Sequence, residues 1–229
     1  MRILYHYPLC PFSRKVRFLL AEKRLDVVLE EADFWKKTPE FIKLNPLGQV
    51  PILSDLQDQI ICDSSVISEY LEEMYPERSF LGTTISERTE VRRICAWFDS
   101  KFANDVTLPL LKEKLLKRLG AIVGSRGTNA GPDSGMIRAA KTASLQHLNY
   151  LGWLIERRTW LAGGFFSLAD ITAAAHISSI DYLGDITWEK IPLVHTWYAR
   201  IKSRPTFRSF FKDRIPGIMP CPHYENLDF

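Results

Sequence analysis

Hydrophobic residues follow two different periods along this chain, and the change between them divides it into two parts. In residues 1–76, short apolar runs of strand length alternate with helical patterns. Their order is strand, helix, strand, helix, strand, strand, helix. Beyond residue 85 the apolar positions recur at helical spacing only. The pattern therefore predicts an α/β domain followed by an all-helical domain.

Turn and cap residues place the elements of the first part. Ser13 is a candidate N-cap for the first helix, and Asp63, Ser64 and Ser65 precede the last one, which runs to about residue 74. The sequence also predicts a short helix over residues 39–44, and strands over 3–7, 26–31, 50–53 and 60–62, the last two joined by a hairpin tip at 57–59.

The second part has its own punctuation. Pro109 predicts a kink in a long helical pattern over residues 87–117, and five glycines make residues 120–135 a loop. Ser167 and Asp170 match a capping box, which we expect to be structural. The predicted organisation is an α/β domain over 1–76, a linker over 77–85, a helical domain over 86–213 and a proline-rich tail over 214–229.

Composition and charge exclude several classes of function. A net charge of +3 and the lack of a basic arm argue against nucleic-acid binding. The four cysteines are scattered and form no Cys/His cluster, so the sequence predicts no metal site and no disulfide framework. No segment approaches the ~20 apolar residues that cross a bilayer. We expect a soluble, cytoplasmic protein without membrane insertion.

The first loop carries the main candidate chemistry. Cys10 stands between a strand and a helix, where free amides and the helix dipole favour an anion and lower the pKa of a thiol. It is therefore a candidate nucleophile. The simpler alternative is a small apolar residue packed under a turn.

Two further segments have the same double interpretation. Pro51 interrupts a short strand, and a cis bond before it would turn backbone groups toward a ligand. Asp63 and Ser64 place a free helix N-terminus where a carboxylate would bind, although their spacing also fits a plain helix cap.

Four motifs in this order resemble the glutathione S-transferase superfamily. Residues 10–13 resemble the active-site turn of its cysteine-type and serine-type members, and residues 49–51 its Val-cis-Pro element. Asp63 and Ser64 resemble its acidic-Ser pair, and residues 167–170 its buried capping box. The resemblance covers residues 3 to about 211 and implies a thioredoxin-like domain (βαβαββα) followed by a helical bundle.

The resemblance also implies roles for individual residues. Either Ser13 stabilises the thiolate of glutathione, or Cys10 forms a mixed disulfide; both stay open. Glutathione then acts as co-substrate, with a small electrophile or a disulfide as second substrate and no other cofactor. The family pattern further implies a homodimer. The residues that would bind glutathione are Phe12, Gln49, Val50, Pro51, Asp63 and Ser64.

Two segments depart from a plain enzyme. The tail is rich in proline and ends in acidic and aromatic residues, and residues 112–126 carry several basic ones. With residues 7–14, the tail resembles a GST-like branch of alphaproteobacteria whose members bind FtsZ filaments. Partner binding is therefore an alternative of nearly equal weight, and storage of apolar ligands is a weaker third. The candidate partner-binding residues are Lys112, Lys114, Tyr224, Leu227 and Phe229.

Overall fold

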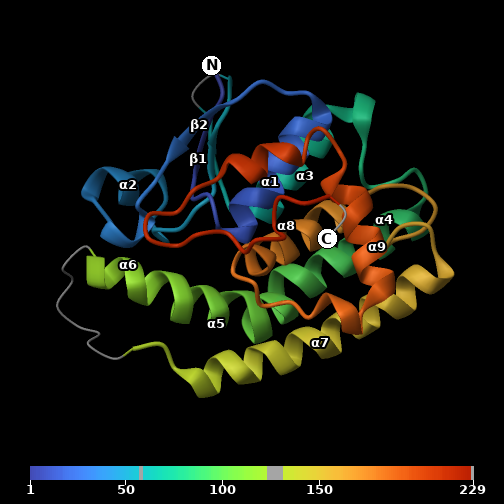
Figure 1. The fold of residues 1–229 in the computed structure, drawn as a ribbon. Helices are drawn as coiled ribbons and strands as arrows, with labels where there is room; N and C mark the ends of the chain where they lie inside the picture. Colours follow the sequence, from blue (N-terminus) through green and yellow to red (C-terminus); the bar gives the residue numbers. More distant parts are fainter. Residues whose placement is uncertain (57–58, 123–130, 228–229) are drawn as a thin grey trace.

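A four-stranded mixed sheet forms one end of the molecule in this computed structural model, which describes residues 1–56, 59–122 and 131–227 (Figure 1). The strand order is β2-β1-β3-β4, with β1 and β2 parallel and the other pairs antiparallel. This confirms the predicted α/β class. The strands are β1 (Ile3–His6), β2 (Val28–Glu31), β3 (Ile52–Ser54) and β4 (Ile60–Cys62).

The strand register brings the predicted motifs to one edge of the sheet. Tyr5 pairs with Ile52, and Ile52 pairs with Cys62. Because both pairs are antiparallel, residues after β1, before β3 and after β4 lie at the same end of their strands. The Cys10 turn, the segment before β3 and Asp63 therefore share an edge. Residues 57–58 of the predicted hairpin tip lie outside the described residues.

Three α-helices belong to the first domain: α1 (Pro11–Lys23), α2 (Pro39–Leu44) and α3 (Ser64–Met74). The prediction that Ser13 caps α1 is wrong. Pro11 occupies the first turn, where its missing N–H costs nothing, so the helix begins three residues earlier and Cys10 is its N-cap. Asp63 caps α3 as predicted, accepting hydrogen bonds from the amides of Ser65 and Val66.

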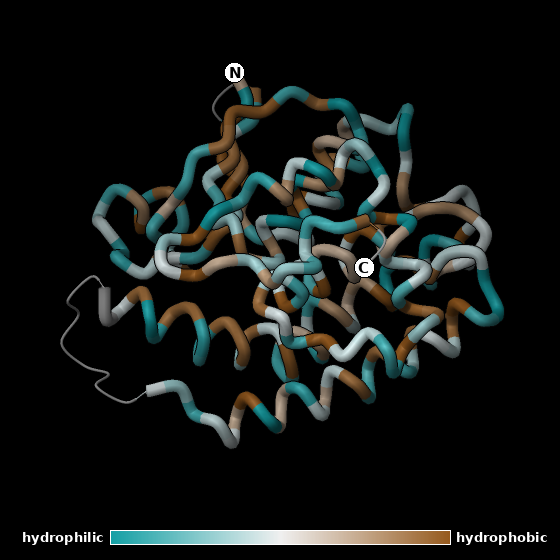
Figure 2. The backbone as a smooth tube through the Cα atoms, in the orientation of Figure 1, coloured by the Kyte–Doolittle hydropathy of each residue, from teal (hydrophilic) through white to brown (hydrophobic). Residues whose placement is uncertain are grey.

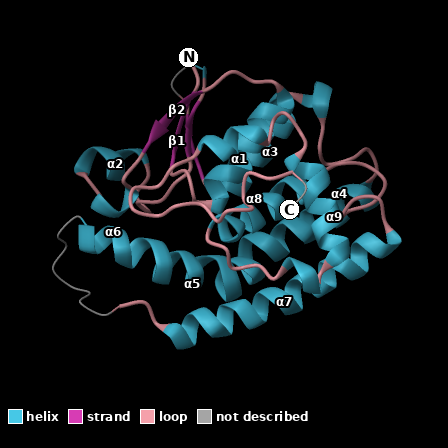
Figure 3. Cartoon of the chain, viewed as in Figure 1, coloured by secondary structure: helices cyan, strands magenta, loops and turns pink. Residues whose placement is uncertain are grey.

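The rest of the chain is helical (Figure 3). Residues 85–122 form one helical run: α4 (Ile85–Ala96), α5 (Leu108–Leu111) and α6 (Lys117–Ile122) are joined by π-helical turns at Trp97–Thr107 and Lys112–Leu116. Pro109 lies beside a widened turn, which relieves the clash between its ring and the preceding carbonyl. The remaining helices are α7 (Ser134–Arg157), α8 (Leu168–Tyr182) and α9 (Pro192–Lys202).

The helix α8 is the centre of the core, because all of its residues are buried. Its capping box is present: the Asp170 carboxylate accepts from the amide of Ser167 at 3.0 Å and from that of Leu161 at 3.0 Å. The structural role predicted for this motif agrees with these contacts. In Figure 2, α5, α6 and α7 alternate between hydrophobic and hydrophilic segments, as expected for helices with one buried face.

The C-terminal tail packs back on the domains. Ile215, Ile218 and Tyr224 are buried, and the ring of Tyr224 lies edge-on to that of Tyr182 in α8. The fold thus includes the tail, although the predicted domain boundaries at residues 76, 85 and 213 stay predictions. Across the described residues, no helix is long and apolar enough to cross a membrane.

A single turn of α1, residues 14–17, buries positive charge that sequence patterning does not reveal. Arg14 and Lys15 have 0% and 1% of their surface exposed, and Arg17 has 7%. Lys15 pairs with Asp99 at 2.5 Å, and Arg14 and Arg17 share Asp213 at 3.0 Å. These ion pairs join α1 to the helical domain.

A buried histidine in β1 makes stability depend on pH. Burial, together with the charge of Arg17, lowers the pKa of His6 from 6.5 to about 4. Between pH 6.5 and pH 4 the His6 side chain is therefore protonated in the unfolded chain but neutral in the folded one. The free energy of unfolding that depends on His6 is fully present above pH 6.5 and decreases as the pH falls toward 4. At pH 4.5 the free energy of unfolding is lower by about 2 to 3 kcal/mol because of His6.

Urea unfolding at pH 7.5 and pH 4.5 tests this effect of His6. Between the two pH values, the free energy of unfolding of His6→Gln should fall by about 2 to 3 kcal/mol less than that of the wild type, because glutamine does not titrate. Equal decreases in the two proteins would contradict the lowered pKa of His6.

Candidate functional site

An apolar cavity of about 270 Å³ lies between the Cys10 turn and the helical run of the second domain. Its walls come from both parts of the chain, as expected for a ligand site between domains. Four predicted residues line it: Cys10, Phe12, Gln49 and Val50. The other lining residues are Tyr7, Pro11, Phe34, Leu108, Leu111, Leu115 and Leu116.

Backbone hydrogen bonds fix the turn that presents Cys10. The Cys10 amide donates to the carbonyl of Tyr7 at 3.0 Å, and the Cys10 carbonyl accepts from the Arg14 amide at 2.9 Å. Behind the turn, the hydroxyl of Ser13 accepts from the amide of Tyr7 at 3.3 Å. The thiol is thereby held at the mouth of α1, in the place the sequence predicts.

The protonation state of this thiol differs from the expectation. Burial raises the pKa of Cys10, and the opposing hydrogen bonds from Ser13 and Phe12 do not reverse the shift. The thiol points to the carbonyl of Val50, with 3.9 Å between sulfur and oxygen. Desolvation by the apolar walls therefore outweighs the helix mouth, and the prediction of a lowered pKa for Cys10 is wrong.

Of the two predicted catalytic residues, Cys10 alone belongs to the cavity wall. Ser13 has 0% of its surface exposed. Its hydroxyl lies against the sulfur and the Tyr7 amide instead of facing a ligand. Ser13 therefore acts on Cys10 rather than directly on a ligand.

Asn45 shapes the loop that leads to Gln49 and Val50. Its side chain accepts from the amide of Leu47 at 3.0 Å and donates to the carbonyl of Gln49 at 2.9 Å. Gly48 completes the turn at φ +61°, a conformation that favours glycine. The Val50–Pro51 bond that follows is cis, which confirms the predicted element.

Asp63 and Ser64 lie at the same sheet edge but outside the cavity wall. Asp63 is exposed, with φ +75°, a strained conformation of the kind that gathers at functional sites. Ser64 is buried, with 3% of its surface exposed. The neighbouring Ser65 is exposed and its hydroxyl lies 3.4 Å from Asp99, so it is the more accessible hydroxyl, which sequence reasoning missed.

The leucine wall of the cavity was also missed. Leu108, Leu111 and Leu115 recur at helical spacing, which was visible in the sequence. A periodic pattern predicts one apolar face but does not say whether that face meets the core or a ligand. The same limit applies to Phe34, whose ring lies 6.0 Å from that of Tyr7.

The predicted partner-binding residues are not equally accessible. Lys112 is exposed and Leu227 half-buried, whereas Phe229 lies outside the described residues. Lys114 instead pairs with the buried Asp185 at 2.6 Å. Tyr224 is fully buried, and its hydroxyl accepts from Arg14 at 3.0 Å, so neither Lys114 nor Tyr224 is presented to a partner.

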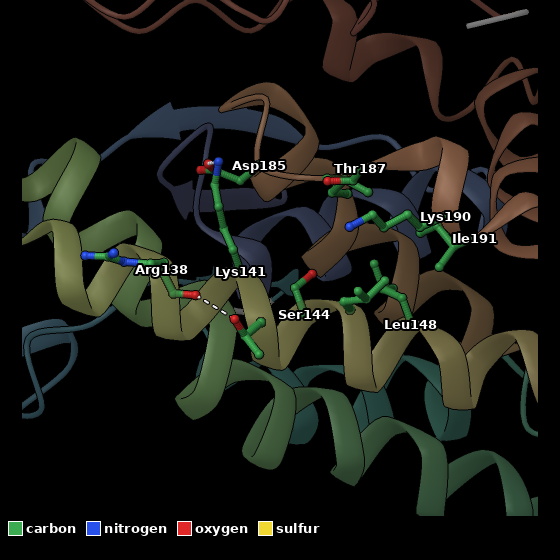
Figure 4. A pocket seen from close by; sticks show the side chains of 11 residues that line it. Arg138, Lys141, Ser144, Leu148, Asp185, Thr187, Lys190 and Ile191 are labelled. Carbon is green, nitrogen blue, oxygen red and sulfur yellow. Dashed lines mark hydrogen bonds and ion pairs between the residues drawn. The ribbon is translucent and has the colours of Figure 1, made fainter.

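A second cavity, of about 230 Å³, has Asp185 in its wall (Figure 4). It lies between α7 and the segment after α8, and Lys141 points from α7 to Asp185 at 2.9 Å. The buried carboxylate thus pairs with two lysines from different helices. In the described part of the chain, no group of three or more His, Cys, Asp or Glu residues is arranged to hold a metal ion.

Comparison with known proteins identifies the family. The glutathione S-transferase N-terminal domain matches residues 4–79, and the glutathione S-transferase C-terminal domain matches residues 135–205. FtsZ-localized protein A of Caulobacter vibrioides is 44% identical over 231 residues, covering 100% of this chain and 98% of the relative. The chain belongs to the glutathione S-transferase family.

Solved structures agree over the whole length. A glutathione S-transferase from Rhodospirillum rubrum is 49% identical, with a TM-score of 0.94 and coverage of 100% of both chains. FzlA from C. crescentus is 44% identical, with a TM-score of 0.94 and coverage of 100% of this chain and 99% of the other. Both similarities include the tail, which the two family domains do not reach.

The leucine wall leads to a first test of the cavity. Leu116 is half-buried and lines it, so Leu116→Trp should fill the space without overpacking the core. We expect the affinity for the apolar dye 8-anilinonaphthalene-1-sulfonate, measured by fluorescence titration, to fall at least about five-fold. Leu193→Trp, at a half-exposed leucine outside this cavity, is the control. Equal affinities in the two variants would mean that the dye binds elsewhere.

Proposed function

We propose that this protein binds FtsZ filaments and acts in bacterial cell division on a glutathione S-transferase scaffold. The observation that carries the proposal is the 44% identity to FtsZ-localized protein A over 100% of this chain. A division partner of this kind implies a cytoplasmic location. The similarity supports the proposal because it extends over the whole chain, including the tail that the two family domains do not reach.

Among the described residues, the accessible part of the predicted surface is Lys112 and Leu227. Lys112 is exposed in a π-helical turn, and a single cation there attracts an acidic partner. Leu227 is half-buried and follows the buried anchor Tyr224, which holds this part of the tail against the helical domain. Lys114 and Tyr224 support this surface from within.

Co-sedimentation with FtsZ polymers tests the proposal. We expect the wild type to pellet with GTP-assembled FtsZ from the same organism, and Lys112→Glu and Leu227→Asp to lower the bound fraction at least about three-fold. Truncation of the tail is a poorer test, because it strips Arg14 of the Tyr224 hydroxyl.

The matched control is Arg88→Glu. Arg88 is exposed on the same helical run but roughly 30 Å away along its axis, so this reversal changes the net charge equally and should retain binding. The proposal is contradicted if the wild-type protein remains in the supernatant when the FtsZ polymers pellet. Normal pelleting of both surface variants places the interface elsewhere.

A second candidate function is glutathione conjugation or thiol transfer at Cys10. It is supported by the position of the thiol in the wall of a cavity between the two domains. Val50, before β3, offers its main chain for strand-like pairing with a tripeptide, and Gln49 and Phe12 flank it. Glutathione would be the co-substrate, with a small electrophile or disulfide as its partner.

The raised pKa of Cys10 bears on which chemistry this candidate performs. A protonated thiol is a poor nucleophile, so thiol transfer requires that the bound ligand, or the hydrogen bonds from Ser13 and Phe12, shift Cys10 toward the thiolate. Asp63 and the exposed Ser65 would meet the γ-glutamyl end of the ligand at the N-terminus of α3.

Glutathione turnover tests this candidate separately. Retention on glutathione resin, followed by reduction of a glutathionyl mixed disulfide, should be seen in the wild type, and Cys10→Ala should lower the rate at least about ten-fold. Cys62→Ala is the control, because Cys62 is half-buried and lies outside the cavity wall. An unchanged rate in Cys10→Ala would exclude the thiol-transfer role.

We also propose that the protein is a homodimer, as the family pattern implies. Val66 and Met74 on α3 have 55% and 52% of their surface exposed, which supports an apolar contact with a second copy through this helix.

A further inference from the structure

Three side chains remote from the Cys10 turn in sequence form a hydrogen-bonded line where the tail meets α8. The sulfur of Cys221 lies 3.2 Å from Nδ1 of His223. The Nε2 atom of the same ring lies 3.0 Å from Oδ1 of Asp181. A thiol, an imidazole and an orienting carboxylate in this order are the parts of an activated nucleophile.

The buried carboxylate decides the direction of these hydrogen bonds. Asp181 has 0% of its surface exposed, and its Oδ1 also accepts from the indole of Trp188 at 3.1 Å. As an acceptor it draws the ring proton of His223 to Nε2. Nδ1 is then the basic nitrogen and faces the thiol, so His223 is placed to take the proton of Cys221.

Cys221 lies near a positive charge and is only partly covered. The amine of Lys202 in α9 lies 3.3 Å from the carbonyl of His223, and its positive charge acts on Cys221. Cys221 itself is half-buried. Gly184 packs beside the sulfur, where an added Cβ would come within 3.2 Å of it.

The other three cysteines lie in different surroundings. Burial raises the pKa of Cys10, Cys62 and Cys95, that of Cys95 to about 11. Cys62 is as half-buried as Cys221, but its thiol donates to the carbonyl of Leu44 at 3.4 Å, which favours the protonated form. Cys62 is thus a matched comparison within the same chain.

The backbone around Cys221 limits the reaction class. Its amide donates to the carbonyl of Tyr182 at 2.9 Å, so it does not stabilise the oxyanion of an acyl transfer. Thiol–disulfide exchange requires no oxyanion site. We propose that Cys221, His223 and Asp181 form a second thiol site, at which Cys221 reacts with low-molecular-weight disulfides to form a mixed disulfide.

The step balances without a further oxidant. His223 takes the thiol proton at Nδ1, and the sulfur of Cys221 attacks one sulfur of the disulfide. One sulfur–sulfur bond forms and one breaks, and the leaving thiolate carries away the electron pair and receives the proton. Cys221 is oxidised to the mixed disulfide, and the leaving half of the incoming disulfide is reduced to a thiol. This site is independent of the proposed FtsZ and glutathione-transfer functions.

Site-resolved kinetics with glutathione disulfide test the proposal. The reduced full-length protein is mixed with glutathione disulfide at pH 7.5, quenched with acid, and each cysteine peptide is quantified by mass spectrometry. We expect Cys221 to form the mixed disulfide at least about ten-fold faster than Cys62, and His223→Gln to remove most of that advantage. The rate at Cys62 should stay unchanged in the variant.

Two results would overturn the proposal. One is a rate at Cys221 no higher than that at Cys62 in the wild type. The other is an unchanged Cys221 rate in His223→Gln with the wild-type melting temperature. A variant that unfolds would raise the rates at all cysteines together, and His223→Asn then repeats the test with a smaller side chain.

Discussion

The buried guanidinium of Arg14 is the interaction on which the arrangement of the whole molecule depends. It donates to the carbonyl of Pro8 at 2.7 Å, to Ser178 in α8 at 2.9 Å, and at 3.0 Å both to Asp213, which directly precedes the tail, and to Tyr224 within it. A buried charge needs such partners, and removal of one partner of a buried ion pair costs about 3 to 5 kcal/mol. The Cys10 turn, the central helix and the tail are therefore one connected unit.

This connection gives the Cys10 cavity a rigid floor and an apolar wall. The turn is held from behind by Arg14 and Ser13, while the leucines of α5 and the π-helical turn face the thiol from the other domain. The same apolar wall that suits a ligand also disfavours the thiolate form of Cys10. An apolar cavity thus favours the binding of an apolar ligand but opposes ionisation of the Cys10 thiol. The cavity therefore fits a binding role at least as well as a catalytic one.

Local patterns predicted the fold, and contacts across the chain decided the site. The order of strands and helices along the first domain, the Asp63 cap and the Val50–Pro51 element follow from short signals that a sequence carries intact. The start of α1 was misplaced because the preference of proline for the first helical turn outweighed that of serine for the cap. Arg14 meets Ser178 and Tyr224 at separations of 164 and 210 residues, and no periodicity encodes such pairs.

The anchoring of Tyr224 on the first helix also sets an order of events during synthesis. Arg14 leaves the ribosome well before its phenolic partner Tyr224, which follows it by 210 residues. Until Tyr224 has emerged, the first helix carries a cation that lacks one of its acceptors, and its final packing on α8 waits for that residue. A chain that stops before Tyr224, or loses Tyr224 to a protease, therefore has a loosened turn at Cys10, far away in sequence.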